Sequence, residues 1–222
     1  ALVEADDDGL YVLKFRGAGQ GPKVLVAELI AGEIGRTLGL RVPELVIVDV
    51  DPELGRAEPD QEIQDLLRAS IGANLGLDYL PGSLGYDPTG ERPPPPEEAA
   101  EIVWFDALVT NVDRTARNPN LLTWHGQTWL IDHGAALYLQ HGTAELVDLA
   151  ERAFRMIGEH VLLPHAASIV AAGERLAPRL DAAEIARIVD LVPDGWLTDE
   201  QEPVTVEEIR ARFIEAGAEP DR

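Results

Sequence analysis

Apolar and polar positions alternate in two short segments near the start of the chain and then change to a helical period. Residues 2–5 and 10–15 are rich in strand-forming residues, and the Asp-Gly turn between them is typical of a tight hairpin. Residues 23–38 place apolar side chains three and four positions apart, which predicts a helix that Gly39 ends. A further strand is expected over residues 44–50. The pattern therefore predicts a small α+β unit.

The middle of the chain mixes connectors with further elements. Residues 61–70 fit a short helix, and the glycine-rich residues 72–85 could contain a strand that leads out of the first unit. A proline run closes residues 86–96, and we interpret it as a stiff connector rather than a docking ligand. Residues 97–110 predict an amphipathic helix, and residues 121–131 a β-hairpin.

The C-terminal part of the chain is predicted to be mostly helical. Helical patterns cover residues 145–156, 164–172, 181–189 and 205–216. The last of these begins with a capping box, a threonine followed three positions later by a glutamate. No internal repeat is visible, so we expect helices packed around one irregular loop and one hairpin.

Composition excludes several classes of function. The 222 residues include 18 basic and 40 acidic side chains, a net charge of −22, which disfavours binding to nucleic acid or to anionic membranes. The absence of cysteine excludes disulfides and thiolate chemistry. No apolar run is long enough to span a bilayer and no signal peptide is visible, so we expect a cytoplasmic protein.

Four residues stand in the order in which kinase-like folds supply the groups for phosphoryl transfer from ATP. That chemistry needs a lysine for the nucleotide phosphates, a carboxylate for the acceptor, and oxygen ligands for Mg²⁺. Lys14 lies in the apolar strand VLKF, Asp113 and Asn118 lie in NVDRTARN with kinase-like spacing, and Asp132 follows the second hairpin strand. Each feature alone is weak, but their order predicts an ATP-dependent kinase. A lysine in an apolar strand also needs a partner, and we expect Glu28 on the following helix.

The second acidic residue of that helix, Glu33, is the other candidate partner for the lysine. Glu28 is preferred because it lies one turn closer to the start of the helix, between apolar residues. Taken together, the order of elements predicts a bilobal, protein-kinase-like α+β fold. We expect residues 1–80 to form a small β-rich lobe and residues 81–222 a larger helical lobe that carries the catalytic and metal-binding loops.

The segments VLKF, GAGQGPK, LVAELIAGEIGRTLGLRVPE, NVDRTARNPNLL and WLIDHGAALY resemble the HipA-like kinases, in particular their compact branch. The resemblance extends over residues 10–138. It implies that Lys14 contacts the ATP phosphates, that Asp113 is the catalytic aspartate, and that Asn118 and Asp132 hold Mg²⁺. The family is best known for phosphorylating serine or threonine on proteins, and its toxin members act with a DNA-binding antitoxin.

Three features depart from the usual kinase pattern. His133 stands where a Phe usually follows the metal-binding Asp; we expect it to fill space there and not to act as an acid or base. No glycine-rich loop precedes Lys14, so the small lobe is expected to lack its first strand and that loop. The glycines of residues 17–21 follow the lysine. They either cover phosphate or simply link the lysine strand to the next helix, and we favour the link.

Several functional questions remain open from sequence. Arg114 and Arg117 beside the catalytic aspartate could bind an acidic acceptor or a phosphorylated loop, or could merely offset negative charge. The same ATP machinery serves protein, small-molecule and lipid kinases, so the phosphoacceptor is a protein or a small molecule. A non-catalytic, nucleotide-binding scaffold is the alternative from a different class.

Overall fold

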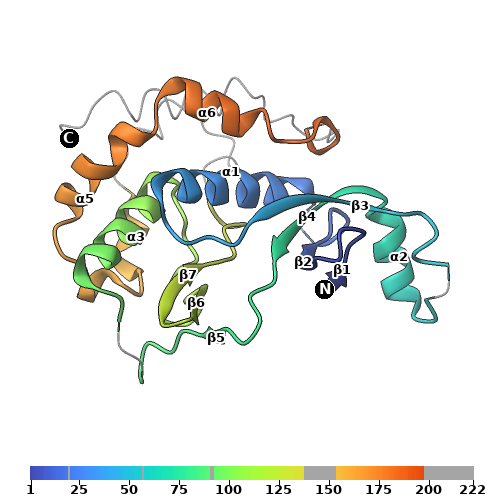
Figure 1. The fold of residues 1–222 in the computed structure, drawn as a ribbon, viewed down its shortest axis with the longest axis horizontal. Coiled ribbons are helices and arrows are strands. Elements are labelled where there is room, and N and C mark those ends of the chain that lie inside the picture. Colours follow the sequence, from blue (N-terminus) through green and yellow to red (C-terminus); the bar gives the residue numbers. More distant parts are fainter. Residues whose placement is uncertain (20, 57, 91–92, 138–153, 198–222) are drawn as a thin grey trace.

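The computed structural model describes residues 1–19, 21–56, 58–90, 93–137 and 154–197. Figure 1 shows a strand-rich N-terminal region at one end, with helix α2 at its edge, and a helical region with α3 and α5 at the other end. Helix α1 lies between them, and α6 runs along its outer side. Residues far apart in the sequence therefore meet around α1.

The N-terminal sheet has four strands in the spatial order β1-β2-β4-β3, with every neighbouring pair antiparallel. Strand β4 lies between β2 and β3, although it follows both in sequence. The strands are β1 (Leu2–Glu4), β2 (Leu10–Lys14), β3 (Leu45–Val50) and β4 (Gly72–Asp78). Val12 pairs with Leu2 on one side and with Leu77 on the other. Since paired residues share a face, these three side chains lie on the same face as Lys14.

Helix α1 (Pro22–Leu38) is buried on most of its surface, which explains its long run of apolar residues. Pro22 occupies its first turn, and Gly39 ends it in the left-handed conformation at φ 85°. A methyl group on Gly32 would lie 2.5 Å from Leu45 Cδ1, so glycine lets the helix pack closely on β3 without moving that side chain. On another side, Thr37 Oγ1 donates to Glu184 Oε1 of α6 at 2.8 Å.

The remaining elements form a second sheet and a group of helices. The three-stranded sheet has the order β5-β6-β7, with β5 (Leu84–Gly85), β6 (Leu121–Trp124) and β7 (Gln127–Leu130). The α-helices are α2 (Gln61–Ala69), α3 (Pro96–Leu108), α5 (Ile169–Leu176) and α6 (Ala182–Val189). The 3₁₀ helices are η2 (Arg155–Glu159), η3 (Leu163–His165), η4 (Ala177–Arg179) and η5 (Asp194–Trp196).

The predicted helix over residues 164–172 is wrong in its bounds. The chain makes only the 3₁₀ turn η3 around Pro164, is extended at Ala166, and begins α5 after Ser168. The Ser168 hydroxyl accepts the N–H of Ala171 at 3.2 Å, so a serine in the middle of the predicted helix is its start. Most of the helix predicted over 145–156 and all of that over 205–216 lie outside the described residues.

One apolar core joins the two regions. It contains residues of α1, α3, β4, the β6–β7 hairpin and the C-terminal helices. Phe105 of α3 is completely buried and lies under Gly35 of α1, whose added methyl group would be 3.4 Å from the ring. Because α1 belongs to the same core as the hairpin, the side chains that α1 and the hairpin present to each other have fixed relative positions. No described helix is both long and apolar enough to cross a bilayer.

Candidate active site

Lys14 connects the N-terminal sheet to both α1 and the segment after β7. Its Nζ donates to Glu28 Oε2 and to Asp132 Oδ1, each at 2.6 Å, although Asp132 is 118 residues away in sequence. Glu28 is completely buried, whereas the side chain of Asp132 is 52% exposed. Glu33 does not reach the lysine and instead pairs with Arg36 at 3.3 Å. The lysine thus has one interior partner and one partner at the surface.

The surroundings of Lys14 favour its charged form. Burial acts to lower the pKa of Lys14, but the carboxylates of Glu28 and Asp132 outweigh it and raise that pKa. Burial would likewise raise the pKa of Glu28, yet its contact with His133 and the positive charge of Lys14 hold that pKa at about 2. At neutral pH the charged Lys14 therefore faces an ionised Glu28 inside the protein.

The loop after α3 brings together Asp113 and three asparagines. Asn118 Nδ2 donates to Asp113 Oδ2 at 2.8 Å, and the Asp113 N–H donates to Asn111 Oδ1 at 3.1 Å. Asn120 Nδ2 lies 3.5 Å from Asp113 Oδ2 and 3.4 Å from the backbone oxygen of Asp132. Asn120 thereby joins the loop to the segment that carries Asp132. Sequence reasoning missed it, although its position two residues after Asn118 in the run Asn-Pro-Asn was visible.

Asp106, Arg114 and His160 form a buried polar network behind this loop. Arg114 Nε donates to Asp106 Oδ2 at 2.6 Å, and His160 Nε2 lies 2.8 Å from the same oxygen. Burial would raise the pKa of Asp106, but the Arg114 charge and the His160 hydrogen bond hold it well below its usual range. Arg114 also donates to the backbone oxygens of Asn120 and Ile131. One side chain therefore ties α3, the Asp113 loop and the end of the hairpin together.

The two arginines beside Asp113 have different surroundings. Arg114 is only 1% exposed, and its guanidinium binds groups inside the protein. The interpretation that it binds an acidic acceptor or a phosphorylated loop is therefore wrong. Its length and guanidinium allow it to reach several oxygens at once, which no local pattern could reveal. Arg117 is exposed, and no ion pair with it is found in the described part of the chain.

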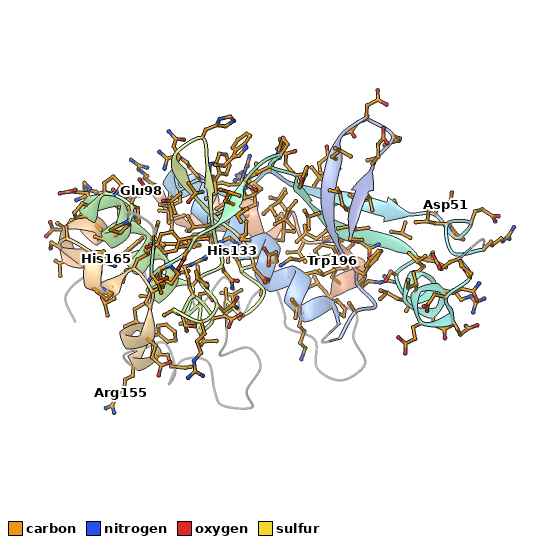
Figure 2. All side chains as sticks on the ribbon, turned by 90° about the horizontal axis from the view of Figure 1, so that it is seen from below. Asp51, Glu98, His133, Arg155, His165 and Trp196 are labelled. Carbon is orange, nitrogen blue, oxygen red and sulfur yellow. The ribbon has the colours of Figure 1, made fainter. Side chains whose placement is uncertain are left out.

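His133 and Gly134 turn the segment after Asp132 towards α1. His133 is completely buried, with Nδ1 3.5 Å from Glu28 Oε1 and its ring edge-on to Phe105 at 5.8 Å. Figure 2 labels His133 near the middle of the molecule, between the strand-rich end with Asp51 and the helical end with His165. A methyl group on Gly134 would lie 2.5 Å from Val24 Cγ1 of α1, so this close approach requires glycine.

The oxygen atoms of the site suit a hard divalent cation. Asp113 and Asp132 provide carboxylates, and Asn118 provides an amide oxygen. No group of three or more His, Cys, Asp or Glu side chains within the described ranges is arranged to hold a metal ion. Mg²⁺ fits such a site because it commonly takes one or two carboxylates and fills its other positions with water and substrate phosphates.

The sheet adds an apolar surface next to this polar cluster. Leu2 and Val12 are 55% and 40% exposed, and both lie on the face of the sheet that carries Lys14. Exposed apolar side chains on the sheet face of Lys14, together with Lys14 itself and the half-exposed Asp132, form a surface with one apolar and one charged part. A nucleotide, with a flat base and a charged phosphate tail, has the same division.

A lysine paired with a buried glutamate and with an aspartate that follows a β-hairpin, together with an Asp/Asn loop, is the arrangement expected of the kinase class of phosphotransferases. The chain belongs to the HipA-like kinase family, whose sequence profile matches residues 2–217. The structure is similar to that of the proinflammatory kinase CtkA of Helicobacter pylori, with a TM-score of 0.57 and 15% sequence identity over 97% of this chain and 91% of that one. No curated protein sequence matches the chain.

The comparisons confirm the predicted family and the predicted kinase-like α+β fold, with a β-rich N-terminal region and a helical C-terminal region. At 15% identity the solved structure supports the fold alone. The individual roles of Lys14, Glu28, Asp113, Asn118 and Asp132 stay predictions, as does the division into lobes at residue 80.

Proposed function

We propose that this kinase transfers the γ-phosphoryl group of ATP, as its Mg²⁺ complex, to a serine or threonine hydroxyl on a protein. One observation carries the proposal: Lys14 contacts Glu28 and Asp132 at the same time, each at 2.6 Å. A phosphate-binding lysine needs a fixed anion behind it and the metal site in front of it. Glu28 and Asp132, which lie in segments distant in sequence, are proposed to fill these two roles.

The nucleotide is proposed to bind between a small lobe of residues 1–80 and a larger lobe of residues 81–222. Leu2 and Val12 would cover the base, since they are exposed and share the sheet face of Lys14. Lys14 would exchange Asp132 for phosphate oxygens while Glu28 continues to hold its ammonium group. Glu28 suits this task although it is buried. Its contact with His133 and the charge of Lys14 hold its pKa at about 2 and so keep it ionised.

Asn118 and Asp132 are proposed to hold the magnesium ion. Asn118 donates to Asp113 through its nitrogen, which directs its amide oxygen elsewhere, and the Asp132 carboxylate is half exposed. When bound, Mg²⁺ neutralises negative charge on the phosphates and orients them. Asn120 would keep the two ligand-bearing segments at a constant separation through its contacts with Asp113 and Asp132.

Asp113 is proposed to orient the acceptor hydroxyl and to take its proton. Asn118 Nδ2 donates to its carboxylate, Asn111 Oδ1 accepts its backbone N–H, and the buried Arg114 fixes the loop from behind. Such positioning supplies most of the catalysis in phosphoryl transfer. A protein acceptor is favoured because Arg117 and Asn118 make this loop an exposed surface, which a hydroxyl on a second protein can reach.

The test measures transfer of label from γ-labelled ATP with Mg²⁺ to the protein itself and to a panel of proteins. The wild type should label serine or threonine, and Asp113→Ala should reduce the rate by a factor of about 10³ or more while the melting temperature changes little. Asp65→Ala, which removes an exposed carboxylate of α2, is the matched control and should keep full activity.

Three results would count against the proposal. Full activity of Asp113→Ala would remove Asp113 from the mechanism. Label found only on small molecules or lipids would replace the protein acceptor. If ATP and Mg²⁺ neither raise the melting temperature nor support any transfer, the chain is a scaffold instead of an enzyme.

A further inference from the structure

His133 and Glu28 leave three buried polar atoms without hydrogen-bond partners. Both side chains are completely buried, and Glu28 Oε1 and both ring nitrogens of His133 have no partner among the described residues. The atoms Nδ1 and Oε1 are 3.5 Å apart, just beyond a good hydrogen bond. An unpaired buried carboxylate oxygen is costly, so a shift of a few tenths of an ångström that pairs these two atoms is favourable.

The surroundings select the position of the ring proton. A neutral imidazole carries one proton, on either Nδ1 or Nε2. With the proton on Nε2, the lone pair of Nδ1 would face the Glu28 carboxylate, and the N–H would be buried without a partner in a part of the core that includes Phe105. With the proton on Nδ1, the N–H faces the carboxylate and only a lone pair stays unpaired.

We infer that His133 is a positioning residue, whose Nδ1–H holds the Glu28 carboxylate in the orientation that presents Oε2 to Lys14. The inference rests on the proposed role of Lys14 in binding ATP. Glu28 then has one oxygen for the lysine and the other for the histidine. The imidazole thus takes the place of the apolar side chain usual at this position and adds a hydrogen bond that such a side chain lacks.

The position of His133 in the chain gives this contact a further consequence. His133 directly follows Asp132, the proposed metal ligand, and Gly134 packs against Val24 one turn before Glu28 on α1. Lys14 is held by both Glu28 and Asp132. When phosphates draw Lys14 away from Asp132, the histidine still connects Glu28 to the Asp132 segment. The metal ligand and the anchor of the lysine therefore keep a fixed relation during nucleotide binding.

A spectroscopic test needs no enzymatic activity. ¹⁵N NMR of the histidine side chains distinguishes a protonated ring nitrogen from a bare one, and His133→Asn identifies the His133 signals by their loss. His160 is an internal control with the opposite tautomer, because its Nδ1 accepts the N–H of Leu162 at 3.0 Å while Nε2 faces Asp106. We expect a proton on Nδ1 of His133 and on Nε2 of His160. A bare Nδ1 on His133 would overturn the inference.

A kinetic test uses the shapes of two amides. Asn places an N–H close to the position of Nδ1, whereas Gln places one near Nε2, and Phe has none. His133→Asn should keep the KM for ATP within about threefold of the wild type, and His133→Gln and His133→Phe should raise it about tenfold or more, the equivalent of one lost hydrogen bond to a charged group. Equal KM values for the Asn and Phe variants would refute the positioning role.

The two proposals fail in different ways. If the wild type binds no ATP, the proposed function fails, and the tautomer of His133 still decides whether it holds Glu28. If the wild type binds ATP and the three variants bind it equally well, the proposed function stands and the role of His133 is wrong. Melting temperatures show whether each variant is folded, and the NMR measurement on the wild type does not depend on them.

Discussion

Arg114 and Asp106 form an ion pair in which neither side chain has exposed surface, with Nε and Oδ2 2.6 Å apart. The pair lies behind the loop that carries Asp113, and the arginine also holds the backbone at Asn120 and Ile131. The residue next to the proposed catalytic aspartate therefore acts on the interior of the protein, and it fixes the segments of Asp113 and Asp132 relative to each other.

Removing the arginine should destabilise the protein strongly. Among the described side chains, Arg114→Met leaves the buried Asp106 with His160 and Asn111 as partners, which should lower the free energy of unfolding by about 3 kcal/mol. Urea unfolding followed by circular dichroism measures this. Arg68→Met, which breaks an exposed pair with Asp65, should change little. Equal effects of the two substitutions would show that the buried network does not hold the loop.

Acid should destabilise the protein through Glu28. Its pKa falls from 4.5 to about 2 on folding, so its contribution to stability is complete above pH 4.5 and is lost as the pH falls towards 2. For this buried group the contribution is on the order of 3 kcal/mol. Asp106, whose pKa also lies below its usual range, adds to the loss. The free energy of unfolding should decrease from pH 6 to pH 2, and this decrease should be smaller in Glu28→Gln. An equally steep dependence on pH in the variant would contradict this.

Gly134 should be needed for the approach of the Asp132 segment to α1. Gly134→Ala places a methyl group 2.5 Å from Val24 Cγ1, so α1 and Glu28 should shift and the KM for ATP should rise. Gly158→Ala is the control, since a methyl group there meets nothing within 4 Å. The additional change Val24→Ala should restore much of the ATP affinity. If that double variant binds ATP no better than Gly134→Ala, the contact with Val24 is not the cause.

Asn120 should affect turnover more than stability. Asn120→Asp keeps a residue that tolerates the positive φ of 48° but removes the donor and places a negative charge against Asp113. The kcat should fall about tenfold or more, with a small change in melting temperature. Steady-state kinetics at saturating ATP decides this. A kcat equal to that of the wild type would show that Asn120 does not position the loop.

The parts of the site that follow from local chemistry could be predicted from sequence. A lysine in an apolar strand needs a buried anion, and the order of Lys14, the acidic helix and the Asp/Asn loop indicated the kinase fold. The burial of Arg114 and the approach of His133 to Glu28 could not be predicted, because they depend on how α3, α1 and the hairpin pack together. The prediction of one helix around Pro164 failed for a similar reason. Apolar residues do recur there with a helical period, but Ser168 caps a new helix.

The most direct test of the account measures ATP affinity with and without Mg²⁺ for the wild type, Lys14→Met and Asp132→Asn. If Lys14, Asn118 and Asp132 form one nucleotide site, Mg²⁺ should strengthen ATP binding to the wild type about tenfold or more. Lys14→Met should weaken binding under both conditions, and Asp132→Asn should abolish only the effect of Mg²⁺. An ATP affinity that changes neither with Mg²⁺ nor on the loss of Lys14 would contradict the account.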